Sequence, residues 1–196
     1  SFIEKKNKFE VNQLVLDNNL KINNLKKIKL DYFDKNLIEN KINIINKNNI
    51  YNFTGSKYNA SSLIENLING DSNNLKILDK NFDFYVKLDQ VYLDKKSVIN
   101  DLTGKLSFKK SEISNAELNA SFSKNKRFKF TVNTNQTKKV TTLFLDQAEA
   151  IVKKYKFIKG YKGGSLDFYS TKEENKSISN LKIYDFKLNE LPILTK

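Results

Sequence analysis

The chain has 196 residues and a formal net charge of +13, with 35 basic residues against 22 acidic ones, and it contains no cysteine and no histidine. These absences exclude a disulfide, a thiolate nucleophile, an imidazole base and a Cys/His metal site. Arg127 is the only arginine. Since phosphate and base-edge recognition depends on the planar fork of arginine, the lysine-based charge indicates a general positive field more than a nucleic-acid reader.

Methionine is also absent, so we expect a processed chain or a fragment of a larger protein, with 1–196 forming a single β-rich unit. No stretch approaches 18 uninterrupted apolar residues. A membrane anchor would therefore lie outside this sequence.

The first part of the chain, from 9 to 58, consists of short runs in which apolar and polar residues alternate. Clusters of Asn, Asp and Lys separate the runs at 17–19, 34–36 and 47–49. This pattern is typical of consecutive β-strands joined by turns.

A short helix is predicted over about 61–69, where Ser61 can cap an apolar stripe that Gly70 can end. The polar run 70–74 follows and divides the chain into sub-regions 1–74 and 75–196. Because this run is too short for a free linker, we expect the sheet to continue across it.

Four consecutive strands with period two are predicted between 82 and 132. Their alternate apolar residues would share one face of the sheet. The candidate positions on this face are Phe82, Phe84, Val86, Leu88, Leu106, Phe108, Leu118, Phe122, Phe128, Phe130 and Val132.

The segment 146–171 reads as helix, turn and strand. Asp146 and Glu149 have the spacing of a capping box at the start of a helix over about 147–157. Gly163 and Gly164 supply a turn before the next strand. In the last strand the apolar phase slips near Ile183, which indicates a bulge.

Together these elements predict a mainly β fold, a long antiparallel curled sheet that forms an open groove, with two short helices. Two such helices cannot cover the apolar face of a long sheet. That face must fold over on itself, meet another sheet, or line a groove.

The sequence offers no motif for an enzyme, a cofactor or a metal ion: it has no phosphate-binding glycine loop and no local acid/base pair. Nucleic-acid binding is disfavoured for a geometric reason. Phe128 and Phe130 alternate with Arg127 and Lys129, so rings and cations would point to opposite faces, whereas a stacking platform needs them on one surface.

Several segments, in this order, resemble the C-terminal region of the AsmA-like proteins of Gram-negative bacteria. They are NFTGSKYNASSLIENLI, FDFYVKLDQVYL, DQAEAIVKKYKFIKGYKGGSLDFYS and ISNLKIYDFKLNELPIL. The positions that match the family pattern include Asp146, Ala148, Gly163, Gly164, Asp185 and Pro192. The chain departs from the pattern at Glu149, where the family often has glycine, and in its abundance of lysine.

The resemblance implies a periplasmic protein anchored to the inner membrane by a segment outside this sequence. It also implies a hydrophobic β-groove that moves phospholipid towards the outer membrane and supports envelope integrity. The eleven apolar candidates would then contact acyl chains, with headgroups near lysines such as Lys87, Lys105 and Lys129. Two alternatives stay open: a β-sandwich module without a ligand, and a basic nucleic-acid-binding module.

Overall fold

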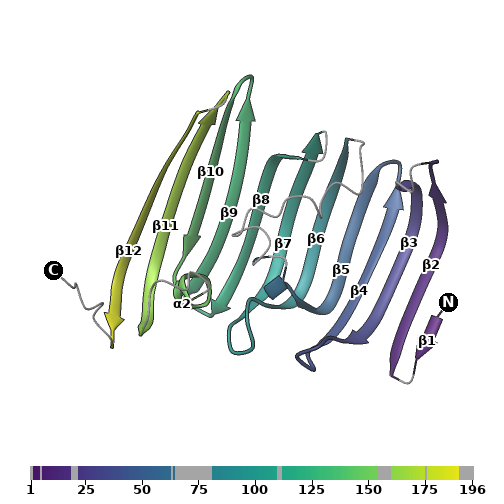
Figure 1. Cartoon of the computed structure of the whole chain (residues 1–196), viewed down its shortest axis with the longest axis horizontal. Helices are drawn as coiled ribbons and strands as arrows, with labels where there is room; N and C mark the ends of the chain where they lie inside the picture. Colours follow the sequence, from purple (N-terminus) through teal and green to yellow (C-terminus); the bar gives the residue numbers. More distant parts are fainter. Residues whose placement is uncertain are drawn as a thin grey trace.

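The computed structural model describes residues 2–4, 6–18, 22–62, 64, 81–109, 112–153, 160–174 and 176–189. Within them the chain forms one 12-stranded sheet whose strands lie side by side in sequence order (Figure 1). The strands are β1 (Phe2–Glu4), β2 (Asn7–Leu16), β3 (Ile22–Phe33), β4 (Glu39–Lys47), β5 (Ile50–Asn59), β6 (Phe82–Tyr92), β7 (Val98–Lys109), β8 (Glu112–Ser123), β9 (Lys126–Asn135), β10 (Lys138–Leu145), β11 (Tyr161–Glu173) and β12 (Lys176–Leu188). Helix α2 (Glu149–Val152) stands between β10 and β11.

The mainly β fold predicted from the sequence is confirmed, but the sheet is mixed. All neighbouring strand pairs among the described residues are antiparallel except β5 and β6, which run parallel. A parallel pair needs a crossover of a dozen or more residues. The stretch 60–81 provides that length, so the sheet does continue across the predicted boundary.

Only parts of the two predicted helices lie within the described residues. Ser61, Ser62 and Ile64 are helical, and the rest of 61–69 lies outside the described residues. Helix α2 is shorter than the predicted 147–157: Lys153 forms a turn after it, and 154–159 lie outside.

Two of the predicted turns can be followed in full. Asn48 and Asn49 have φ values of 54° and 63°, the positive values that a two-residue hairpin turn requires. Asp34 accepts hydrogen bonds from the backbone N–H groups of Asn36 and Ile38, at 2.7 and 3.1 Å, and closes the turn between β3 and β4. Asn19 of the turn predicted at 17–19 lies outside the described residues.

The sheet has one mainly apolar face and one mainly polar face. The most deeply buried part of the apolar face lies where α2 packs against β10 and β11. Leu145, Ala148, Val152, Tyr161 and Leu166 are each at most 2% exposed there. The β-sandwich alternative is not what the described residues form, because all their strands belong to one sheet.

Candidate functional site

The apolar face carries a continuous line of cross-strand neighbours, which we call the central row. It takes one residue from each strand from β2 to β12. Its members are Val11, Ile28, Ile44, Phe53, Val86, Gly104, Leu118, Phe130, Leu143, Phe168 and Leu181. With strands about 4.8 Å apart, the row is about 48 Å long. It holds no polar side chain over that length.

Most of the central row is neither fully buried nor fully open. Val86 is the most buried member, at 6% exposed, and Leu181 is the most open, at 50% exposed. The other members have intermediate exposure. A core residue closed by its own chain is normally close to fully buried. The intermediate values leave apolar surface along the row for another molecule to cover.

The eleven candidates from the sequence all project to the apolar face, but they divide into two groups by burial. Five are buried by the chain's own packing: Phe82, Val86, Leu88, Phe122 and Val132. The six intermediate ones are Phe84, Leu106, Phe108, Leu118, Phe128 and Phe130. Only the second group has surface to offer a ligand.

An aromatic cluster closes the apolar face at the start of β6. The rings of Phe82 and Phe108 stack with centroids 4.7 Å apart, and Tyr51 lies 5.5 Å from Phe82 and 5.3 Å from Phe84. Such pairs add about 0.5–1.5 kcal/mol beyond their area burial. They explain why Phe82 is buried although it starts a strand.

Gly104 in the central row allows β7 and β8 to approach each other closely. Its φ is +149°, and a Cβ at this position would lie 1.9 Å from the backbone oxygen of Glu117. Only glycine fits there. No side chain therefore projects from the central row at this position.

Several of the residues that match the family pattern lie together around α2, next to β11. The backbone N–H of Ala148 donates to the Gly164 carbonyl at 2.8 Å, and a Glu149 carboxylate oxygen accepts from the Gly163 N–H at 2.9 Å. The pKa of Glu149 is lowered below its ordinary value, mainly by the hydrogen bond from Gly163 and secondly by the hydrogen bond from the Lys153 ammonium. These contacts fix α2 to the start of β11.

The capping role predicted for Asp146 is wrong. The N-cap is Ala148, and it makes no side-chain capping bond. The Asp146 carboxylate instead accepts from the Arg127 backbone N–H at 2.6 Å, and the Asp146 N–H donates to the Arg127 carbonyl at 3.0 Å. Because the Asp146 carboxylate is bonded to the backbone of β9, it links β9 to the end of β10 and does not cap the helix.

Among the pattern residues, Gly164 and Asp185 both have a positive φ. Gly164 has φ +76°, and a Cβ there would lie 2.6 Å from Tyr161 Oη and 2.8 Å from the Tyr184 carbonyl. Asp185 is exposed, has φ 53°, and lies next to the β12 residues that pair with Gly163 and Ser165. The bulge predicted near Ile183 is wrong, because β11 and β12 keep one register from Tyr161 and Leu188 to Glu173 and Lys176. Pro192 lies outside the described residues.

The lysines expected near lipid headgroups are on the wrong face. Lys87, Lys105 and Lys129 project to the polar face, because each alternates with a residue of the apolar face. Lys105 is also engaged there, since it forms an ion pair with Asp83 at 2.7 Å and lies 5.4 Å from the Tyr85 ring centroid. Arg127 likewise lies over Phe144, at 5.0 Å, and not beside Phe128 or Phe130.

Strand β10 and its contribution to the apolar face were not predicted from the sequence. Leu143 and Leu145 pair with Phe130 and Phe128 on one side and with Phe168 and Leu166 on the other. Val140 and Phe144 project to the opposite face, so both faces of this strand are partly apolar and the period-two signal is weak. The register of β10 with β9 shows which of its residues belong to the apolar face.

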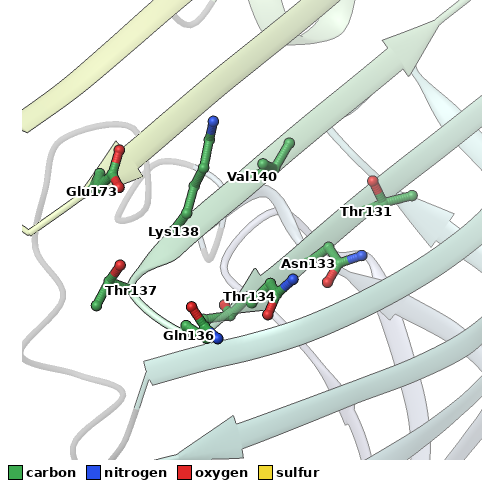
Figure 2. Close-up of a pocket in the computed structure, with 9 residues that line it drawn as sticks. Thr131, Asn133, Thr134, Gln136, Thr137, Lys138, Val140 and Glu173 are labelled. Carbon is green, nitrogen blue, oxygen red and sulfur yellow. The ribbon is translucent and has the colours of Figure 1, made fainter.

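A hollow of about 800 Å³ lies at the β9–β10 hairpin (Figure 2). Hydroxyl, amide and charged side chains line most of it, among them Thr131, Asn133, Gln136 and Lys138. Glu173 is the single carboxylate in this lining. The hollow thus has neither the apolar lining that acyl chains need nor a pair of carboxylates.

Within the described part of the chain, no three acidic residues come close enough to hold a metal ion. The described helices include none with the length and apolar character of a membrane span. Comparison with known proteins finds no matching family model, no matching curated protein and no matching solved structure.

Proposed function

We propose that this protein is a non-enzymatic lipid carrier of the AsmA-like type, which holds phospholipid acyl chains against the central row. In this proposal it moves phospholipid between the inner and outer membranes through the periplasm and supports envelope integrity. The observation that carries the proposal is the central row itself, apolar on every strand from β2 to β12 and only partly buried along its length.

The energy of such binding comes from apolar contact alone. Each methylene removed from water contributes about 0.8 kcal/mol, so a chain of about sixteen carbons gains on the order of 10 kcal/mol. One leaflet of a bilayer core is about 15 Å thick, so a row of about 48 Å accepts more than one acyl chain end to end.

The same uniformity favours transfer over fixed storage. The central row has no hydrogen-bonding or charged side chain that would hold a lipid at one register. A chain that slides by one strand exchanges similar contacts for similar contacts, so movement along the row crosses only small energy differences. The polar face keeps the sheet hydrated on its other side.

The test adds charge to the middle of the row. Leu118 and Phe130 are direct cross-strand partners. We expect the variant L118D/F130D to lose at least about tenfold in uptake of a fluorescent phospholipid, because two carboxylates there would have to be desolvated by an acyl chain. Far-UV circular dichroism checks that the sheet is retained. The milder single variants L118N and F130N are expected to give intermediate uptake.

The matched control is N119D/N133D, which adds the same two charges to β8 and β9 on the polar face, at exposed positions. We expect it to take up lipid as the wild type does. Undiminished uptake by folded L118D/F130D would contradict the proposal, and so would an equal loss in the control.

A further inference from the structure

The apolar face changes character along the strands towards the β9–β10 hairpin. Beside the central row, the next cross-strand line includes Ala116, Val132, Thr141 and Ser170. The line beyond it includes Ser114, Thr134, Lys139 and Lys172. Carbon side chains thus give way first to hydroxyl groups and then to ammonium groups on a single face.

Lys139 and Lys172 are direct cross-strand partners at the end of this gradient. Side chains in this relation have Cβ atoms about 4.5–5.5 Å apart, and like charges there repel. Within the described part of the chain, neither ammonium forms a hydrogen bond or an ion pair. Glu112 acts on Lys139 through its charge but forms no ion pair with it, so the two adjacent cations favour the binding of an anion.

The surroundings of Lys139 strengthen this reasoning. Burial lowers the pKa of the Lys139 ammonium below its ordinary value; Glu112 opposes this effect and Lys172 adds to it. A partly desolvated cation gains more from a bound anion than a fully hydrated one does.

A hollow of about 350 Å³ lies at the two lysines. Lys109 is a third cation in its lining, Ser114, Thr134 and Thr137 supply hydroxyl groups, and Glu112 and Glu174 supply carboxylates. Three ammonium groups against two carboxylates leave a net charge of +1. The Ser114 and Thr134 hydroxyls already donate to the carbonyls of Ser107 and Ser114. The ammonium groups and the Thr137 hydroxyl therefore supply the donors for phosphate oxygens, whereas the carboxylates suit the hydroxyl or amine of a headgroup.

We propose that Lys139 and Lys172 form a phosphate subsite for the lipid whose acyl chains lie on the central row. This inference rests on the proposed function and adds a position for the headgroup. Lys139 is four residues from Leu143 along β10, a distance of about 13 Å. The hydroxyls of Thr141 and Ser170 lie between, where the glycerol and ester groups of the lipid would be.

The test compares lipids that share acyl chains and differ in the phosphate. Phosphatidylglycerol and diacylglycerol with identical chains compete against a fluorescent fatty acid, with glycerol 3-phosphate as a probe without acyl chains. We expect the wild type to bind phosphatidylglycerol about tenfold more tightly than diacylglycerol, the usual effect of charge-assisted hydrogen bonds. We expect K139Q/K172Q to lose this preference and to keep its affinity for diacylglycerol.

The matched control, K87Q/K129Q, removes two lysines from the polar face and should keep the preference. A wild type that binds both lipids equally, or a K139Q/K172Q variant that keeps the preference, would overturn the subsite and leave lipid binding intact. Glycerol 3-phosphate that binds as tightly as the lipid would overturn the headgroup assignment in favour of a free phosphoester site. A wild type that binds neither lipid would overturn the proposed function as well.

Discussion

Asn40 provides a sharp test of what holds the N-terminal half of the sheet together. Its side chain is completely buried, accepts the Asn59 N–H at 2.7 Å and donates to the Ile38 carbonyl at 3.0 Å. In N40A both backbone groups lose this partner. The lost bonds and the desolvated groups left behind cost about 3 kcal/mol in total. In a chain of this size, that lowers the melting temperature by about 6–12 °C.

The measurement is thermal unfolding followed by circular dichroism, with N43A as the control. Asn43 lies on the same strand, and its side-chain oxygen is buried without a hydrogen-bond partner. Its removal should change the free energy of unfolding by only about 0.5 kcal/mol. If N40A melted at the same temperature as N43A, the hydrogen bonds of Asn40 would not have the stabilising role inferred for them.

Three further predictions concern the contacts around α2. G164A should cost about 3 kcal/mol through left-handed strain and steric overlap, and G163A only about 1 kcal/mol, because its nearest contact is 4.0 Å away; equal losses in denaturant unfolding would contradict this. E149Q should be less stable than the wild type at neutral pH, and the difference in the free energy of unfolding should close on acidification. A carboxyl whose pKa is lowered by folding stabilises the folded state above its unfolded pKa, and it loses this effect as the pH falls through its folded pKa. A difference that persists at low pH would contradict the prediction. Y161F should be neutral or more stable by about 1 kcal/mol, since the Tyr161 hydroxyl is buried without a partner; a clear loss of stability in thermal unfolding would refute that.

The strands of the second half were predictable because their alternation is long. Phe82 to Leu88 and Phe128 to Val132 keep period two without interruption, so their common face follows from the sequence. The open, mainly β sheet follows from the scarcity of helices. Both predictions depend only on local pattern.

Features that depend on pairing were not predictable in the same way. Parallel and antiparallel strands have the same period, so the sequence did not reveal that β5 and β6 run parallel. The capping prediction for Asp146 failed because its partner, Arg127, lies 19 residues earlier and competes for the carboxylate. Local spacing contains no information about such a competitor.

The candidate site shows the same division. Six of the eleven predicted apolar positions have surface available, and alternation identified their face correctly. It did not show that Lys139 and Lys172 share that face with the apolar row, because their placement follows from the register of β9, β10 and β11. The headgroup lysines chosen from sequence are on the polar face for the same reason.

Native mass spectrometry of gently purified protein, with lipid extraction from the same sample, tests the lipid-carrier proposal most directly. We predict a population heavier by the mass of one or more phospholipids, which the extraction identifies and which L118D/F130D lacks. Wild-type protein that stays free of lipid, even after incubation with excess phospholipid in detergent micelles, would contradict the proposal that the apolar face takes up acyl chains.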